Sequence, residues 1–169
     1  LIDNSIFSAE FFNNLYIKDK KKFYIYYNVY VKQICYLLNL LGININTVPV
    51  LDVKRRITNK VIGNRSFSSN PFVVSKLGKI CIKKYHENRI GTVIKHIPGH
   101  GLSKVDSHNK LPIIKESINL LNKTDFLPFK KQNSFLAMTA HIVYSSIDSK
   151  NTATHSQKVI NIIRKKIGF

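Results

Sequence analysis

The residues best suited to chemistry lie in one short stretch, from position 95 to position 108. It reads Lys-His-Ile-Pro-Gly-His-Gly, then four more residues, then Asp-Ser-His, and it holds three of the protein's six histidines. The apolar run 91–94 leads directly into Lys95, which predicts a buried strand that ends in polar side chains. In α/β folds, functional side chains collect in the loops that follow the carboxyl ends of strands. We therefore interpret this stretch as a candidate active-site loop.

Two pairs of residues in this loop suggest specific roles. Asp106 and His108 are two positions apart, so in a loop the carboxylate can accept a hydrogen bond from the imidazole. Such a pair fixes the tautomer and stabilises the imidazolium, which suits general acid–base catalysis near neutral pH. Lys95 and His96, adjacent at the end of a strand, would donate hydrogen bonds to hydroxyl groups or to a ligand carboxylate. The alternatives are a surface Asp and His without a catalytic task, and a solvated strand end.

A metal site is the main rival interpretation of the same histidines. His96 and His100 have the four-residue spacing of zinc ligands on a helix. Pro98, Gly99 and Gly101 oppose a helix at this point, so the spacing loses its geometric meaning. The glycines around His100 resemble a phosphate-binding loop in composition only, since the full P-loop spacing is absent. We expect neither a metal nor a cofactor.

Composition sets broader bounds on fold and partners. At 169 residues and 44% hydrophobic content, the chain is long enough for one domain over 1–169 with a sizeable core. Its net charge of +18 would suit nucleic acid or an anionic surface. However, the basic residues are mostly lysines spread along the whole chain, without an arginine cluster or a basic–aromatic array. We interpret the charge as compositional drift, and keep nucleic-acid binding as the weaker alternative.

Localisation and cysteine chemistry follow from the same reading. No apolar run approaches the roughly 18 residues of a membrane span, and no basic segment precedes an apolar one as in a signal peptide. We therefore expect no membrane partner and a cytoplasmic location. Cys35 and Cys81 each lie in a helix-like apolar pattern, without metal-ligand spacing or a disulfide framework. They are interpreted as two buried, reduced thiols.

Hydrophobic periodicity predicts an alternation of helices and strands. Helices are predicted over 20–41, 71–86, 115–122 and 155–167, and strands over 43–52, 90–96 and 135–140. This order indicates right-handed βαβ units with a parallel sheet. Polar residues follow each strand, including Asp52 and His141 after the first and third, which favours a (β/α)-barrel with function on one rim.

The residues also resemble a known family. The loop motif, with Ile97 where the family usually has Phe, is similar to the signature of bacterial β-N-acetylglucosaminidases of glycoside hydrolase family 3. Further blocks resemble that family in the right order, and they cover nearly the whole chain from about residue 7. These blocks are 48–53, 61–68, 125–129, 138–141, 156–160 and 167–169.

The resemblance implies a (β/α)8 TIM-barrel fold, here a partial barrel of about three to four βα units. It implies a retaining β-N-acetylhexosaminidase that removes non-reducing-end N-acetylglucosamine from a saccharide or muropeptide during peptidoglycan recycling. Carried over by position, Arg65, Lys95 and His96 would hold the sugar. His108 would be the acid/base, and Asp106 would orient and tune it. For Asp52 and His141 we expect only a pocket or structural role.

The resemblance also implies that part of the machinery is missing. The family's nucleophile is an aspartate on the strand that follows the helix ending in Gly-Phe, and this chain stops at Phe169. An acidic Gly-Gly-Arg block that grips the sugar is absent from the N-terminus. Because a retaining mechanism needs its nucleophile, we expect the 169-residue chain alone to be catalytically inactive. It would be a fragment, one half of a split enzyme completed by a second polypeptide, or an inactive remnant.

Overall fold

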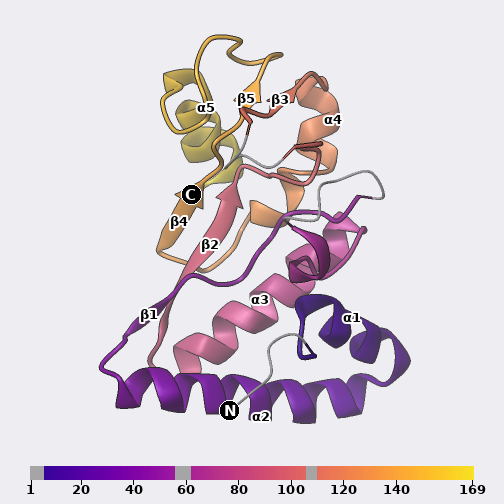
Figure 1. The fold of residues 1–169 in the computed structure, drawn as a ribbon, viewed down its shortest axis with the longest axis vertical. Helices are drawn as coiled ribbons and strands as arrows, with labels where there is room; N and C mark the ends of the chain where they lie inside the picture. Colours follow the sequence, from indigo (N-terminus) through magenta and orange to yellow (C-terminus); the bar gives the residue numbers. More distant parts are fainter. Residues whose placement is uncertain (1–5, 56–61, 106–109) are drawn as a thin grey trace.

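A computed structural model describes residues 6–55, 62–105 and 110–169. Two helices open the described chain, and strands and helices then alternate towards the C-terminus (Figure 1). The helices are α1 (Ala9–Lys18), α2 (Lys20–Leu40), α3 (Pro71–Glu87), α4 (Ile118–Lys123) and α5 (Gln157–Ile162). Single turns occupy η1 (Gly63–Arg65), η2 (Leu127–Phe129) and the π-type η3 (Ile163–Ile167). The strands are β1 (Ile45–Asn46), β2 (Gly91–Ile97), β3 (Ile113–Ile114), β4 (Leu136–Thr139) and β5 (Val143–Tyr144).

The main sheet is parallel, with β2 in the centre between β1 and β4. Ile45 lies opposite Gly91 on one side of β2, and Val93 lies opposite Leu136 on the other. A second, two-stranded parallel sheet pairs β3 with β5. The fold is therefore α/β with parallel sheets, as predicted, and within the described residues the sheet does not close into a barrel.

Local signals in the sequence explain where the main helices begin and end. Asn70 caps α3, because its side-chain oxygen accepts hydrogen bonds from the N–H groups of Phe72 and Val73, and Pro71 occupies the first turn. Asp19 lies between α1 and α2 and caps the start of α2. Gly42, at φ +71°, adopts the left-handed conformation that ends α2. The predictions for α2 and α3 are thus confirmed to within about a residue.

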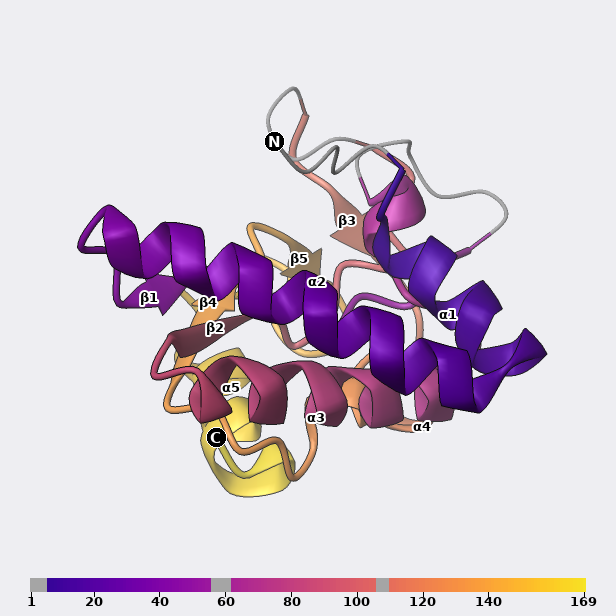
Figure 2. The same ribbon diagram turned by 90° about the horizontal axis from the view of Figure 1, so that it is seen from below.

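An aromatic cluster joins the first two helices. Phe12 of α1 meets Tyr27 of α2 edge-on at 4.7 Å between ring centroids, and Tyr27 stacks on Phe23 at 5.2 Å. All three rings are buried. Figure 2 shows α2 and α3 running side by side, and α3 in turn packs on β2 and η2. These helices form the outer layer that supports one side of the sheet.

The two cysteines are free and buried, which confirms the interpretation as reduced thiols. Cys35 lies on α2 and Cys81 on α3. Burial raises the pKa of the Cys81 thiol to about 12 and that of Cys35 to about 11. Because the thiolate is the reactive form, neither thiol is activated for nucleophilic chemistry at neutral pH.

The structure corrects several predicted elements. The strand predicted over 43–52 is regular only at Ile45–Asn46, and pairing resumes as a single bridge between Val50 and Lys95. Pro49 lies in the interruption, and proline has no N–H to give to a ladder. Helix α1 was not predicted, although Ser8 provides a cap and Phe12 and Tyr16 have helical spacing. Strands β3 and β5 were not predicted either, because two residues each are too few to show a period.

Both edges of the main sheet carry exposed apolar side chains. On one edge, Ile45 of β1 is 45% exposed. On the other edge, Met138 of β4 is 41% exposed, and Phe135, which directly precedes β4, is 88% exposed. In a closed barrel each of these edges would be paired with another strand. Among the described residues, no helix combines the length and apolar character needed to cross a membrane.

The aromatic cluster yields a test of the packing. Phe23→Ala removes a buried ring from contact with Tyr27, and we expect it to lower the free energy of unfolding by about 3–5 kcal/mol. Tyr36→Ala, at a 60% exposed position of the same helix, serves as the matched control and should change it by less than about 0.5 kcal/mol. Urea unfolding measures both, and equal losses would contradict the described packing.

Candidate functional site

The candidate loop begins at the end of β2 and turns back into the protein. Two backbone hydrogen bonds hold Lys95 against the segment after β1: Leu51 N–H donates to the Lys95 carbonyl at 2.7 Å, and Lys95 N–H donates to the Pro49 carbonyl at 3.2 Å. The Lys95–His96 and Ile97–Pro98 peptide bonds are cis. Residues 97–101 are buried. The loop is therefore an ordered, inward-packed segment up to this point.

A buried carboxylate holds this loop. Asp52 is completely buried, and its Oδ2 lies 2.6 Å from Nδ1 of His96. Its Oδ1 accepts hydrogen bonds from the backbone N–H of His100 at 2.7 Å and from that of His96 at 3.3 Å. The carboxylate thus contacts one ring and two backbone positions of the loop at once. The sequence predicts only a pocket or structural role for Asp52, and its spacing along the chain does not indicate these contacts.

A second buried carboxylate, Asp125, lies behind the same loop. Arg55 donates to its Oδ2 at 2.7 Å, and the Thr124 hydroxyl donates to the same oxygen at 3.0 Å. Burial raises the pKa of Asp125, with a smaller contribution from the charge of Asp52, while Arg55 opposes the shift. Sequence reasoning had placed Asp125 in a family-like block without assigning it a role.

The glycines of the loop are explained by how closely it packs. A Cβ atom on Gly99 would lie 2.7 Å from the Asp125 carbonyl oxygen, and one on Gly101 would lie 2.6 Å from Asp125 Oδ1. Gly99 also has φ +144°, a conformation that other residues rarely adopt. The buried Tyr144 hydroxyl donates a hydrogen bond to the Gly99 carbonyl. The Tyr144 side chain of β5 and the Asp125 segment therefore enclose the loop.

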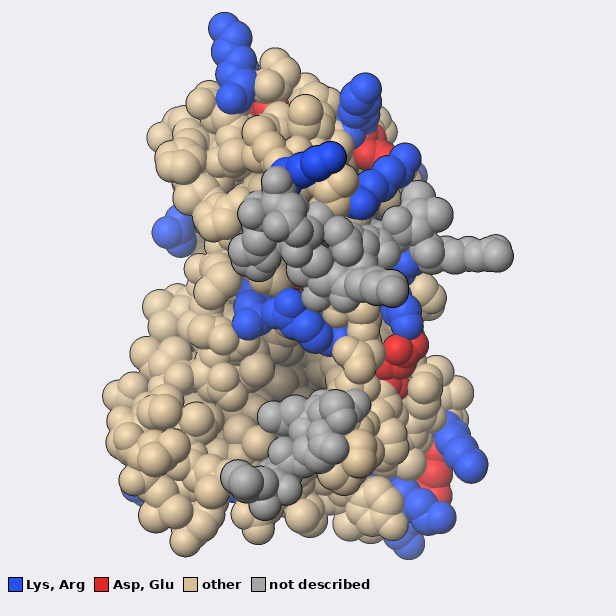
Figure 3. Space-filling model, viewed as in Figure 1, with Lys and Arg blue, Asp and Glu red and all other residues tan. Residues whose placement is uncertain are grey.

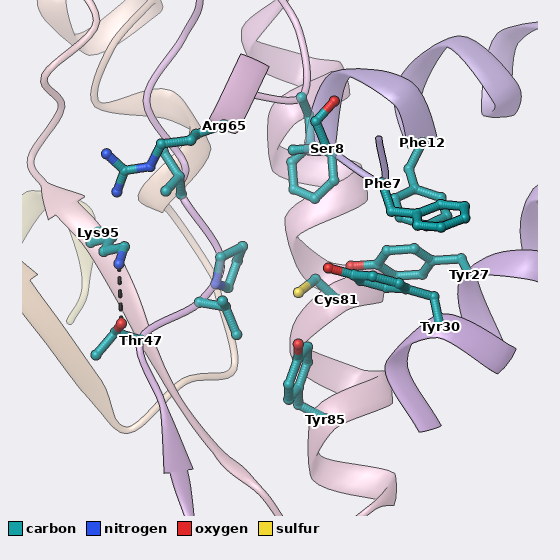
Figure 4. A pocket seen from close by; sticks show the side chains of 15 residues that line it. Phe7, Ser8, Phe12, Tyr27, Tyr30, Thr47, Arg65, Cys81, Tyr85 and Lys95 are labelled. Atoms are coloured by element: carbon teal, nitrogen blue, oxygen red, sulfur yellow. Dashed lines mark hydrogen bonds between the residues drawn. The ribbon is translucent and has the colours of Figure 1, made fainter. Parts of the chain in front are cut away.

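Arg65 and Lys95 line one cavity of about 350 Å³ beside the loop. Figure 4 shows the Arg65 guanidinium and the Lys95 ammonium on one side of this cavity, across from the rings of Tyr27, Tyr30 and Tyr85. Lys95 Nζ donates to the Thr47 hydroxyl at 3.1 Å. Basic side chains elsewhere on this face are scattered rather than gathered into one patch (Figure 3). The cavity thus combines two cations with an aromatic wall.

The electrostatics of Lys95 reflect this setting. Burial lowers the pKa of its ammonium group, and the nearby charge of Arg65 lowers it further, while the Asp52 carboxylate acts in the opposite direction. Two cations that face one cavity repel each other, and ligand oxygens with lone pairs would relieve that repulsion. The geometry suits a ligand that presents hydroxyl, carbonyl or carboxylate oxygens to the two cations.

The structure places three of the five predicted site residues. Arg65 and Lys95 share the cavity, whereas the His96 ring faces Asp52 and lies 5.5 Å from the His100 ring. Asp106 and His108, the predicted proton-handling pair, lie outside the described residues. His141 is exposed and its ring contacts the Thr154 hydroxyl at 3.0 Å. Among the described side chains, no group of three His, Cys, Asp or Glu could hold a metal ion.

Comparison with known proteins decides the family. Residues 28–169 match the family described as glycosyl hydrolase family 3 N terminal domain. The chain belongs to this family. It is 37% identical over 148 residues to β-hexosaminidase A of Pseudoalteromonas piscicida, and 35% identical over 135 residues to the β-hexosaminidase of Neisseria meningitidis serogroup C. Each match covers 78% of this chain but only 25% and 37% of the respective relative.

A solved family member shares the fold. The structure of NagZ from Neisseria gonorrhoeae in complex with N-trifluoroacetyl-D-glucosamine superposes with a TM-score of 0.86 at 30% identity. The match covers 96% of this chain and 49% of NagZ. The predicted membership of glycoside hydrolase family 3 is thereby confirmed, and the open parallel sheet corresponds to part of the relative's barrel domain.

The cavity yields a titration experiment. In Arg65→Gln we expect the pKa of Lys95 to rise, because one of the two causes that lower it is removed while burial remains. At a given alkaline pH, more of the Lys95 population would then carry its charge. Side-chain NMR of Lys95 against pH measures the change, with Arg164→Gln on η3 as the control. An unchanged or lower pKa in Arg65→Gln would contradict the described arrangement.

The packing of the loop yields a stability experiment. Gly101→Ala forces a Cβ atom against Asp125 Oδ1 and, at 3.0 Å, against the backbone nitrogen of Val53, so we expect a loss of about 1–3 kcal/mol. In Gly91→Ala the new Cβ meets mainly the exposed Ile45 side chain at 3.3 Å, which can move aside. Chemical unfolding of the two variants should therefore rank Gly101→Ala as clearly less stable.

Proposed function

We propose that this chain provides the sugar-binding and proton-handling part of a retaining β-N-acetylhexosaminidase. The observation that carries the proposal is the pair of cations, Arg65 and Lys95, in one cavity beside a loop held by buried carboxylates. Support comes from the family, whose members of similar sequence are β-hexosaminidases, and from NagZ, which was solved with an N-acylated glucosamine.

The proposed binding step uses the side chains around β2. Lys95 and Arg65 would donate hydrogen bonds to hydroxyl or carbonyl oxygens of a non-reducing-end N-acetylglucosamine. His96, held at Nδ1 by Asp52, would meet the sugar through its other ring nitrogen. The aromatic wall of the cavity would pack against the apolar parts of a ligand.

The proposed chemistry is a double displacement. His108 would protonate the glycosidic oxygen as the bond to the leaving group breaks, and would later take a proton from the attacking water. Asp106 would orient His108 and stabilise its charged form. A carboxylate nucleophile would attack the anomeric carbon as the glycosidic bond breaks, and water would release the sugar from the resulting glycosyl-enzyme in the second step. The resemblance to the family implies that this carboxylate lies on a strand beyond Phe169.

The nucleophile and the missing strands would then come from sequence outside these 169 residues. The exposed apolar edges at β1 and β4 support a second polypeptide, or a longer form of this one, that pairs with the sheet. We propose a muropeptide or a related N-acetylglucosamine saccharide as substrate, turned over in the cytoplasm during peptidoglycan recycling. The alternative is an inactive remnant that retains only sugar binding.

Calorimetric titration with N-acetylglucosamine tests the binding step. We expect the 169-residue chain to bind this sugar in the millimolar range and more tightly than glucose. Lys95→Ala should weaken binding about tenfold or more, because it removes a charged hydrogen-bond donor. Lys83→Ala, an exposed lysine on α3, is the matched control. Absence of binding by the unaltered chain, or equal effects of the two substitutions, would contradict the proposal.

Release of a chromophore from an aryl β-N-acetylglucosaminide tests whether the nucleophile lies outside this chain. The chain alone should release none, since the nucleophile is expected elsewhere. Turnover by the chain alone would show that it holds a complete site. DNA beyond the codon for Phe169 separates the two readings: an intact frame encoding the aspartate strand supports a split or longer enzyme, and stop codons support a remnant.

A further inference from the structure

We propose that Asp52 is the positioning residue of this site: it fixes the ring of His96 and the backbone of the candidate loop, and thereby determines sugar binding. This inference rests on the proposed function for its consequence, but its structural content stands on contacts within the described residues. Asp52 contacts no substrate in this account and acts through its neighbours.

Backbone pairing delivers Asp52 to its place. The bridge between Val50 and Lys95, with the hydrogen bonds from Leu51 to Lys95 and from Lys95 to Pro49, aligns this segment with the end of β2. Asp52 follows two residues after the bridge and is completely buried. Its carboxylate is therefore set by the sheet rather than by a mobile surface loop.

The two carboxylate oxygens of Asp52 bind different parts of the loop. Oδ2 contacts only the His96 ring nitrogen Nδ1, at 2.6 Å, among the hydrogen bonds described for this residue. Oδ1 accepts from the backbone N–H groups of His96 and His100. Because an ionised carboxylate can only accept hydrogen bonds, Nδ1 must carry a proton, and Nε2 becomes the nitrogen that meets a ligand. Asp52 thus selects the tautomer of His96 as well as its orientation.

The backbone carbonyl of Asp52 also connects this residue to Arg65, another of the predicted sugar-binding residues. The buried Ser66 hydroxyl donates to the Asp52 carbonyl at 2.6 Å, and Ser66 is the residue directly after Arg65. Lys95 lies on the strand paired with the Asp52 segment. One residue therefore links the three predicted sugar-binding residues: Lys95 through the sheet, His96 through its side chain, and Arg65 through Ser66.

The pattern of acceptors explains why a carboxylate is required. Asparagine has the same shape, but it offers one acceptor oxygen and one NH2 group. Turned towards His100, the NH2 group opposes a backbone N–H donor. Turned towards His96, it can donate to Nδ1 only if the ring proton moves from Nδ1 to Nε2. Asp52→Asn therefore costs either the bond to the loop backbone or the Nδ1-protonated form of His96, and in both cases the acceptor loses its negative charge.

The unaltered chain provides the first test. We expect nitrogen-15 NMR of the His96 ring to show a proton on Nδ1. A neutral ring with its proton on Nε2 would overturn the proposal, whatever the variants do. This measurement requires no substitution, so a variant that fails to fold does not affect it.

The substitution provides the second test. In Asp52→Asn we expect exchange of the His100 amide hydrogen to accelerate about tenfold or more, and N-acetylglucosamine binding to weaken by a similar factor. The matched control is Asp148→Asn, because Asp148 also accepts hydrogen bonds from two backbone N–H groups, those of Lys150 and Asn151, and from the side chains of Ser156 and Asn151. Equal behaviour of the two variants in exchange and binding would overturn the proposal.

Failure of the proposed function would leave a different signature. If the unaltered chain binds no N-acetylglucosamine, the function is wrong, while the His96 tautomer and the His100 exchange rate still test the role of Asp52. If the chain binds the sugar and Asp52→Asn binds it equally well, the function stands and the positioning role falls.

Discussion

The site depends on the cost of burying a charge. A carboxylate removed from water is tolerated only when its oxygens are hydrogen-bonded, and Asp52 meets this requirement with three donors from the candidate loop. The same bonds leave little freedom to the loop, since releasing it would leave the buried carboxylate without its donors. Stability and ligand geometry are thereby linked through one residue. A positioned His96 ring is the functional result.

Asp125 imposes a second constraint on the other side of the loop. Its ion pair with Arg55 connects the segment after Asp52 to the turn before η2. Gly99 and Gly101 approach it so closely that no side chain fits at either position. Different contacts therefore account for the Gly and His residues of the motif. The glycines are required by close packing against Asp125, and the orientation of the His96 ring is set by its hydrogen bond to Asp52. A loop built this way can present polar groups without moving to bind.

Much of this arrangement could be predicted from the sequence, but not its central contact. In α2 and α3, apolar residues recur at helical spacing over many residues, Gly42 marks the end of α2 and Asn70 marks the start of α3. Local signals were therefore sufficient to predict both helices. The strand β2 and the polar residues at its end could also be predicted from the sequence. By contrast, His96 and Asp52 are 44 positions apart, and only the pairing of β2 with the segment after β1 brings them together. The spacing of residues along the chain does not predict a contact between residues so far apart. It suggested a bond between Asp106 and His108 instead, which lies outside the described residues.

A crystal structure of the chain grown with saturating N-acetylglucosamine tests the central claim most directly. We expect one sugar beside β2, hydrogen-bonded to Lys95 Nζ, Arg65 and His96 Nε2, and with Asp52 still bonded to His96 Nδ1. A sugar bound at another face, or a loop whose His96 ring has left Asp52 in the complex, would contradict it.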